Sequence, residues 1–463
     1  MNIAVSPSLA RPESLARLAR ALGDRVITPG DPGYDSAREV WSATVDRRPA
    51  AIVRPTSAAD VSRAVVFARE TGVDLAIRGG GHSMAGHGTV DDGIVLDMRR
   101  LQGLRIDPSR RIARAEAGVL AGAYTKAAAG HGLATPFGDT ATVGVVGLTL
   151  GGGMGWLSRK HGLTVDNLRS IELVTADGDR VTAGPTEHPD LFWALRGGGG
   201  NFGVVTALEF DLHPLGPIHG GLIALPLTRD VLRNYAEVAA TAADELTMIA
   251  SAVRLPPAPF VPQDLVGTPA LVVLPVHAGG PHDGAAAMSV LRSLANPLIE
   301  RLGPMPYPSM YQLTAEGSRR QAGVTRTHSL RGLDEATIDA IVDGLPAAPA
   351  GRMAMVQVRV LGGAVARVAS DATAYSHRGA GAVIAISAGA EGPSDLEAST
   401  AWAEQLASAI RPRAVGAYVN FLENEGEGRI RAAYGGSTYA RLVGVKRCWD
   451  PTNLFRMNQN IRP

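Results

Sequence analysis

The stretch Arg78-Gly79-Gly80-Gly81-His82-Ser83-Met84-Ala85-Gly86-His87 decides the fold of this chain. It directly follows residues 73–77, a short apolar run that is typical of a β-strand. Glycines allow positive φ angles and let a ligand approach the main chain closely. Their consecutive amide N–H groups can also form a concave anion site. We therefore expect residues 78–87, the first loop, to bind a cofactor and to hold His82 beside it. By itself this loop is compatible with a phosphate, a metal or a flavin.

Two further glycine-rich segments follow. The second loop, residues 138–156, is apolar and carries no charge after Asp139. A backbone of this kind can wrap tightly around a flat ligand, and its glycine content argues against a helix. The third loop, residues 197–203, has the sequence GGGGNFG and precedes an apolar run at residues 204–212. Three such loops within roughly 130 residues predict one large cofactor threaded through the N-terminal half of the chain.

The elements around these loops indicate a mixed α/β region. A capping-box pattern at residues 57–60 and the glycine at position 72 predict where one helix begins and ends. No helix with a third glycine at the required spacing follows the first loop, so the dinucleotide-binding fold is excluded. We expect further helices at 11–22, 120–129 and 189–196, strands at 50–53, 73–77, 94–98, 112–116, 165–174 and 204–212, and a hairpin turn at Asp177-Gly178.

Beyond Pro214 the glycine clusters thin out, and strand-like runs alternate with helical ones. This pattern predicts an α+β substrate domain, with a sheet covered by helices. In residues 353–360 the valines share one face of a strand, while Gln357 and Arg359 share the other. That polar face could line a pocket or face water. We expect strands at 222–225, 248–253, 270–276, 353–361 and 383–387, and helices at 229–243, 284–294, 333–343 and 393–410.

Composition limits the classes of protein that fit. The 463 residues suffice for two or three domains, and the formal net charge of +1 gives no sign of a nucleic-acid or membrane partner. Because Cys448 is the only cysteine, an intramolecular disulfide is impossible and a cysteine metal site is not expected. Residues 1–7 lack a secretory-signal pattern, and no apolar run is long enough to span a membrane. We expect no metal site and a soluble, cytoplasmic protein, monomeric or homodimeric.

The three loops and the C-terminal stretch together resemble a known family. Arg78–His82 is similar to an R-G-G-G-H flavin loop, and residues 142–153 and 199–205 are similar to the second and third flavin-binding segments. Near the C-terminus the matching motifs are Tyr418-Val419-Asn420, Tyr434-Gly435, Tyr439, Arg441-Leu442 and Asp450–Phe455. The chain thus resembles the berberine-bridge-enzyme-like branch of the vanillyl-alcohol oxidase/p-cresol methylhydroxylase flavoproteins.

This resemblance implies an α+β protein with a two-lobed FAD domain and an inserted substrate domain that has an antiparallel sheet covered by helices. The expected segments are an N-terminal cap (1–44), the FAD domain (45–215), the substrate domain (216–410) and a C-terminal segment (411–463) that returns to the FAD domain. The residues expected at FAD are Arg78, Gly79, Gly80, Gly81, His82, Ser83, Gly86, His87, Gly138, Thr140, Thr142, Val143, Gly144, Gly147, Gly152, Gly153, Gly155, Trp156, Asp166, Asn167, Gly203, Val205, Tyr418, Asn420 and Asn458.

The family's covalent bond from a histidine to the flavin 8α-methyl carbon maps onto His82. Many members add a second bond from a cysteine, but Thr140 stands at that position here, and Ala141 replaces the usual proline. Because a hydroxyl is far less nucleophilic than a thiolate at neutral pH, we predict one attachment, through His82. Met154 also departs from the pattern, since some members place a catalytic tyrosine there.

The resemblance implies an oxidoreductase that removes a hydride from a C–OH or C–N carbon of a sugar, alcohol or other small secondary metabolite to flavin N5. Molecular oxygen would reoxidise the flavin and give hydrogen peroxide. Tyr418 is the first candidate base, with Arg359 or Lys446 as a cation that supports it; Tyr439 and Gln357 complete the candidate catalytic set. The alternatives are a dehydrogenase with another electron acceptor, and a flavin-containing binding protein whose active site has lapsed.

Overall fold

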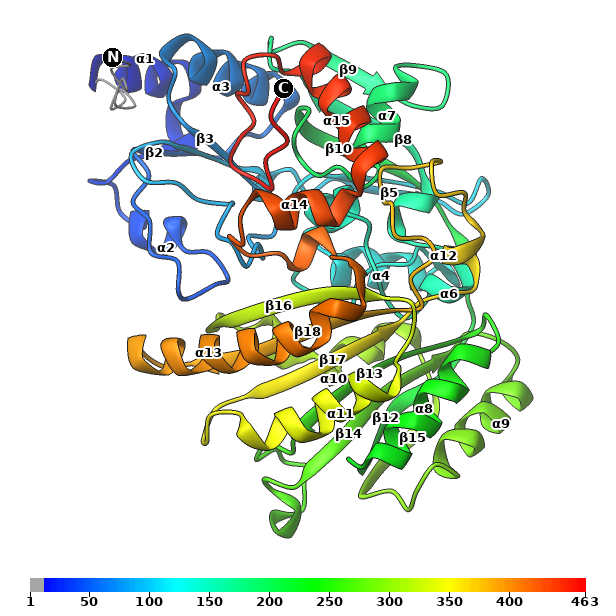
Figure 1. Cartoon of the computed structure of the whole chain (residues 1–463). Helices are drawn as coiled ribbons and strands as arrows, with labels where there is room; N and C mark the ends of the chain where they lie inside the picture. The colour runs from blue at the N-terminus through cyan, green and yellow to red at the C-terminus, as the bar shows by residue number, and fades with distance from the viewer. Residues whose placement is uncertain (1–11) are drawn as a thin grey trace.

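The computed structural model describes residues 12–463 and contains three main sheets. The first two sheets and the C-terminal helices occupy the upper part of the molecule in Figure 1, and the largest sheet occupies the lower part. The sequence predicted that a helix starts at Arg11 and that residues 1–7 lack a secretory signal. Both stretches lie outside the described residues. Within residues 12–463, no helix combines the length and the apolar character needed to cross a bilayer.

The first loop leaves a small, mostly parallel sheet. Its strands are ordered β1 (Val26–Ile27), β2 (Ala51–Val53), β4 (Ile94–Asp97) and β3 (Leu75–Arg78). Helix α3 (Ala58–Thr71) precedes β3. The Ser57 hydroxyl accepts a hydrogen bond from the Asp60 amide, and Gly72 ends the helix at φ +69°. The predicted start and end of this helix are therefore confirmed, and β3 delivers the first loop at Arg78.

The second sheet is antiparallel and joins the second and third loops. Its strands are ordered β5 (Leu104–Asp107), β6 (Ile112–Glu116), β10 (Val204–Asp211), β8 (Leu168–Val174) and β9 (Arg180–Ala183). Gly178, at φ +87°, lies in the predicted turn between β8 and β9. Helices α4 (Ala121–Ala129) and α7 (Pro189–Leu195) pack with this sheet around edge-to-face contacts between Tyr124, Phe137 and Phe210.

The third sheet has eight antiparallel strands. In spatial order they are β15 (Ile299–Met305), β12 (Ile218–Pro226), β14 (Pro269–His277), β13 (Leu246–Arg254), β17 (Ala354–Val360), β18 (Ala382–Ala390), β16 (Ala322–Leu330) and β19 (Ala414–Gly416). Helices α8 (Arg229–Thr241), α9 (Pro281–Arg292), α11 (Glu335–Gly344) and α13 (Pro393–Ile410) share one apolar core with it, and Figure 1 shows them across the front of this sheet. The predicted α+β fold with a helix-covered antiparallel sheet is confirmed. The domain boundaries themselves stay a prediction.

One expectation about the secondary structure is wrong, and several elements were not predicted. The second loop contains a short helix, α5 (Val145–Leu150), although its glycine content argued against one. The helix forms because Val145, Thr149 and Leu150 are buried against the second sheet, so tertiary packing outweighs intrinsic propensity. Strands β15 and β16 were not predicted. Polar residues fill β16, and β15 is a half-exposed edge strand, so neither has a clear apolar alternation.

The C-terminal segment returns to the first two sheets. After β19 it forms helices α14 (Glu427–Tyr434) and α15 (Gly436–Trp449), drawn in orange and red at the top of Figure 1. The fully buried Lys446 ammonium donates to Asp450 at 2.7 Å, to the Asn201 carbonyl at 2.8 Å and to the Phe455 carbonyl at 3.0 Å. Lys446 thus links the C-terminal segment to the third loop, and all three of its ammonium hydrogens are used in these contacts.

Candidate active site

The first and second loops touch through their backbones. A Cβ atom at Gly80 would lie 2.3 Å from the Gly144 nitrogen, and a Cβ at Gly144 would lie 2.4 Å from the Gly80 nitrogen. The second loop is held in place by α4, because the Ala121 and Gly122 amides donate to the carbonyls of residues 143 and 141. Only glycine permits this approach, so these two positions fix how the loops meet.

The first loop presents unpaired donors. Within the described chain, the amide N–H groups of residues 80–84 have no protein acceptor. A run of free amides around Gly81, at φ +77°, suits an anionic group such as a phosphate. The buried Arg78 guanidinium, by contrast, is used inside the protein. It donates to Asp97 at 3.1 Å and to the Ala37 carbonyl at 2.6 Å, and so anchors the start of the loop.

His82 is held between two side chains. Its Nε2 lies 2.9 Å from the Thr142 hydroxyl of the second loop, and its ring stacks on Trp41 with 5.5 Å between centroids. Burial lowers the pKa of His82 to about 4, so the imidazole is neutral at pH 7. His87 is also kept neutral, since burial and the charge of Arg47 lower its pKa to about 4.

Tyr418 lies where the C-terminal segment meets the second loop. Its buried hydroxyl accepts hydrogen bonds from the Gly153 amide and the Asn420 amide group, both at 3.0 Å. Asn420 also donates to the Leu148 carbonyl at 2.9 Å, which fixes its orientation. Burial raises the pKa of Tyr418, while the two hydrogen bonds and the charge of Arg359 oppose that rise.

Arg359, on β17, packs on Phe421, the ring that also contacts Tyr418. Its guanidinium donates to Asp139 at 2.7 Å, to Gln357 at 2.9 Å and to the Met154 carbonyl at 3.3 Å, and it lies 5.2 Å above the Phe421 ring. The polar face of residues 353–360 therefore points inward rather than to water, and its valine face forms core, as predicted. The structure brings together Tyr418, Asn420, Gln357 and Arg359, which come from segments far apart in the sequence.

Comparisons with known proteins agree with this arrangement. Residues 49–184 match the family described as FAD binding domain, and residues 417–462 match that described as berberine and berberine like. (R)-6-hydroxynicotine oxidase of Paenarthrobacter nicotinovorans is 32% identical over 460 residues, which cover 95% of this chain and 96% of that protein. This chain belongs to the berberine-bridge-enzyme-like family of FAD-linked oxidoreductases.

Further relatives share the whole length of the chain. An FAD-linked oxidoreductase of Bacillus subtilis is 32% identical over 459 residues, covering 96% of this chain and 97% of that protein. The crystal structure of 6-hydroxy-D-nicotine oxidase from Arthrobacter nicotinovorans has a TM-score of 0.85 at 28% identity and covers all of both chains. Glucooligosaccharide oxidase from Acremonium strictum shares the fold, with a TM-score of 0.87 at 24% identity, over 98% of this chain and 99% of that one.

The residues of this FAD-linked oxidoreductase fit its cofactor. Around the third loop and the chain end, several buried polar atoms have no protein partner within residues 12–463, among them the side-chain oxygens of Asn453, Asn458 and Asn460 and the Tyr434 hydroxyl. No atom lies within 4 Å of where a Cβ would stand at Gly147 or Gly200, so a ligand can approach the backbone on that side. These unpaired groups, together with the free amides of the first loop, suit a large ligand with many polar atoms.

Some predicted site residues of this flavoenzyme serve other contacts. Tyr439 lies on α15 in the core of the second sheet, in a different apolar cluster from Tyr418. Trp156 is buried against Tyr307 and Tyr311, which lie in short helical segments after β15. Asp166 forms a two-pronged ion pair with Arg378, and Asn167 bonds to His213 and to the carbonyls of residues 161 and 163. Lys446, the alternative cation for Tyr418, is bound to Asp450 instead.

Three residues of the site were missed in the sequence. Trp41 contacts His82 from a segment expected to be only a cap. Asp139 pairs with Arg359, and the available signal was that it is the only charged residue in the second loop. Tyr375 packs against Gly152 and lies 6.4 Å from the Tyr418 ring, but no motif marks its segment.

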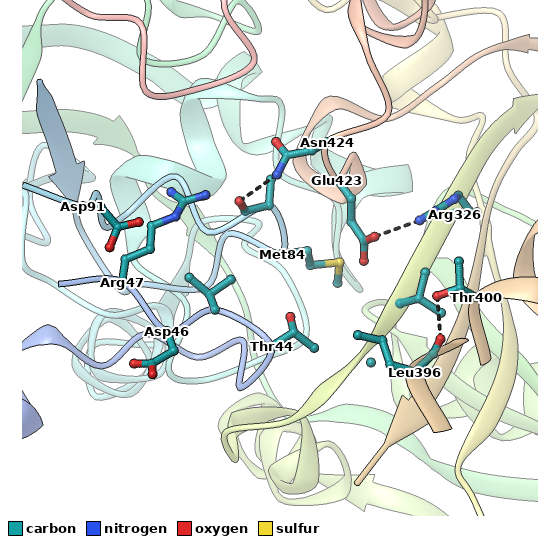
Figure 2. A pocket seen from close by; sticks show the side chains of 14 residues that line it. Thr44, Asp46, Arg47, Met84, Asp91, Arg326, Leu396, Thr400, Glu423 and Asn424 are labelled. Carbon is teal, nitrogen blue, oxygen red and sulfur yellow. Dashed lines mark hydrogen bonds and ion pairs between the residues drawn. The ribbon is translucent and has the colours of Figure 1, made fainter. Parts of the chain in front are cut away.

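A separate polar pocket of about 520 Å³ is lined in part by Met84 and Ala85 of the first loop. Figure 2 shows Met84 reaching toward it from that loop, opposite the Arg326–Glu423 ion pair at 2.8 Å. Thr44 and Thr400 line its rim. None of the Tyr418 cluster lines this pocket, so it is distinct from the candidate catalytic centre.

Proposed function

We propose that this FAD-linked oxidoreductase oxidises a C–OH or C–N carbon of a small molecule, with molecular oxygen as the electron acceptor. His82 alone would hold FAD covalently, and when bound this cofactor would supply the two-electron acceptor for the substrate's hydride, with oxygen reduced to hydrogen peroxide. The FAD domain comprises residues 45–215 and 411–463, and residues 216–410 bind the substrate.

The observation that carries this proposal is the pair of donors on Tyr418. Because the hydroxyl oxygen already accepts from Gly153 and Asn420, its own proton must point to a third partner. The same donors stabilise the phenolate once that proton leaves. Tyr418 is therefore the base that takes the proton from the substrate's hydroxyl or amine as the hydride departs.

Arg359 and Gln357 complete the substrate end of the site. The guanidinium makes three hydrogen bonds inside the protein, which hold it rigidly on β17. Its positive charge favours the phenolate of Tyr418, while Asp139 limits that effect. A fixed charge of this kind contributes to catalysis without reorganising during the reaction.

The substrate class is supported by the names of relatives. One of the two relatives with 32% identity is named a hydroxynicotine oxidase, which favours a cyclic amine for this enzyme. Oxidases named for xylooligosaccharides and glucooligosaccharides share the fold only. We therefore expect heterocyclic amines to be the preferred substrates, ahead of secondary alcohols and sugars.

The test is turnover of a substrate panel under air with direct measurement of peroxide. Reduction of the bound flavin by an amine or alcohol, with peroxide formed in equal amount, supports the proposal. Flavin reduction without peroxide, but with turnover on an artificial electron acceptor, would identify a dehydrogenase. A flavin-loaded protein that no panel member reduces would favour the binding-protein alternative.

The covalent bond is tested separately. The protein is precipitated in acid, and the yellow colour is followed into the pellet or the supernatant. Flavin retained by the wild-type chain and lost in His82→Ala supports the bond to His82. Flavin released from the wild-type chain refutes it.

A further inference from the structure

His82 has two ring nitrogens in different surroundings. Nε2 lies 2.9 Å from the Thr142 hydroxyl, whereas Nδ1 has no partner among the described residues and is accessible. The ring itself cannot rotate freely. Trp41 stacks against it at an interplanar angle of 27°, and the Trp41 indole is fixed by donating to the Gly317 carbonyl at 2.9 Å. The ring therefore presents Nδ1 to any ligand that reaches the first loop.

Thr142 is equally well fixed. It stands between Ala141 and Val143, whose carbonyls accept from the two amides at the start of α4. Its own carbonyl packs against Gly80 of the first loop. The backbone of the two loops therefore fixes the position of the Thr142 hydroxyl next to Nε2 of His82.

We propose that Thr142 is the positioning residue for covalent attachment, and that its hydroxyl engages Nε2 so that the bond to the flavin forms at Nδ1 of His82. This inference rests on the proposed function, because it presupposes FAD bound through His82. It adds which neighbouring side chain orients the His82 ring for the attachment.

The chemistry requires this division of roles. A neutral imidazole has one N–H and one nitrogen with a free lone pair, and only the latter is a nucleophile. When Nε2 donates its proton to the Thr142 oxygen, the lone pair is on Nδ1. Burial keeps the ring neutral at pH 7, as the pKa of about 4 requires. As Nδ1 attacks, positive charge develops on the ring, and the Thr142 oxygen stabilises the Nε2 proton.

The attachment reaction conserves atoms and electrons. A bond forms between Nδ1 and the flavin 8-methyl carbon, and one C–H bond of that methyl group breaks. That hydrogen and the imidazole proton, with two electrons, are gained by the flavin ring system, which becomes two-electron reduced. Molecular oxygen then takes two electrons and two protons to give hydrogen peroxide, and the oxidised, attached cofactor remains.

The experiment follows attachment rather than turnover. Full-length apoprotein variants are mixed with FAD under air. Total bound flavin is read from absorbance, and covalent flavin from the acid-precipitated pellet over time. Thr142→Val, which keeps the shape and removes the hydroxyl, should bind FAD but attach it roughly 10- to 100-fold more slowly, the range for losing a hydrogen bond to a charged group. Thr142→Ser, the matched control, should attach it within a few-fold of the wild-type rate.

The position of the bond gives a second readout that needs no variant. In the histidyl-flavin peptide from the wild-type protein, methylene protons attached at Nδ1 correlate by NMR with Cε1 and the quaternary Cγ. Attachment at Nε2 would instead give a correlation with Cδ2. Attachment by Thr142→Val at the wild-type rate, or a bond at Nε2, would overturn the inference. Complete release of flavin from the wild-type protein by acid would overturn it too, by refuting the His82 bond itself.

Discussion

The Tyr418 hydroxyl and the Arg359 guanidinium show how single residues set the chemistry of this site. Both are buried, and each is held by groups from other segments. A buried phenol is poorly ionised unless charges and donors favour its phenolate. For Tyr418, burial raises the pKa, the Gly153 and Asn420 hydrogen bonds lower it, and Arg359 and Asp139 adjust it in opposite directions.

Replacing Tyr418 with phenylalanine should lower kcat by roughly 10²- to 10⁴-fold, the usual contribution of a general base. The measurement is the rate of flavin reduction by saturating substrate in a stopped-flow instrument. Tyr375→Phe is the matched control, because the Tyr375 hydroxyl is buried in the same apolar cluster without a partner among the described residues. Its kcat should change by no more than a few-fold. Full activity in Tyr418→Phe would remove this residue from the mechanism.

Charge removal at Asp139 and at Arg359 should shift the pH profile in opposite directions. If the Tyr418 phenolate is the active form, kcat/KM rises with pH as this group ionises. The Asp139 charge raises the pKa of Tyr418 and the Arg359 charge lowers it. Asp139→Asn should therefore move the rising limb to lower pH, and Arg359→Gln to higher pH, each by up to about one unit. Profiles from pH 6 to 10 measure this, and shifts of the same sign would contradict it.

At the scale of the element, the glycine loops were predictable and the contacts between them were not. The strand-to-loop transition at Arg78 and the helix ended by Gly72 follow from local rules about propensity and capping. Helix α5 was missed because its stability comes from the burial of Val145 and Leu150, and the local sequence does not show which residues will be buried. In the same way Trp41 and Asp139 join the site only through tertiary packing.

The backbone contact between the first two loops gives a prediction at this scale. Gly144→Ala places a methyl group 2.4 Å from the Gly80 nitrogen, where no flexible side chain can yield. The loops must separate, so we expect FAD affinity of the apoprotein to fall at least roughly 10-fold, by analogy with other overpacked sites. Fluorescence titration with FAD measures this. Gly428→Ala on α14, where no atom lies within 4 Å of the new methyl group, should bind FAD as the wild type does. Equal affinity of the two variants would show that the loops can separate without cost.

At the scale of the whole molecule, a short helix joins the third sheet to the rest of the chain. In α6 (Ser158–His161), Arg159 donates to the carbonyls of Ala242 and Leu361, and Lys160 donates to the Ala278 carbonyl at 2.5 Å. The α+β class and the separate third sheet were predictable, because the glycine clusters thin out beyond Pro214 and strand-like runs alternate with helical ones. This junction was not, because it consists of side chains that reach backbone carbonyls in distant strands.

The same helix contains an acid-sensitive contact. His161 stacks on His213 with 4.0 Å between ring centroids and an interplanar angle of 9°. His213 lies 2.5 Å from the Asn167 side-chain oxygen, and the His161 Nε2 atom is buried without a partner in the described chain. Burial, then the charges of His213 and Lys160, lower the pKa of His161 to about 3. Burial also lowers the pKa of His213, with Asp211 opposing and Arg111 and Lys160 adding to the effect.

These lowered pKa values make the folded protein less stable in acid. A histidine in the unfolded chain takes up a proton near pH 6.5, whereas the folded chain resists protonation of His161 down to about pH 3. Between these values the unfolded state binds more protons, so stability is fully present above about pH 6.5 and falls as the pH falls. Each such histidine contributes at most about 1.4 kcal/mol per pH unit.

We therefore expect the Tm of the wild-type protein to drop between pH 7.5 and pH 5.0, and His161→Gln to reduce that drop. The neutral glutamine cannot gain a charge beside His213 and Lys160, so acid no longer strains the junction at α6. The test compares the two Tm differences rather than the Tm values, because the substitution also changes packing at neutral pH. His282→Gln, at a fully exposed position on α9, is the control and should show the wild-type drop. An unchanged drop in His161→Gln would mean that acid weakens the molecule elsewhere, for example at the buried His328 on β16, whose pKa burial lowers to about 4.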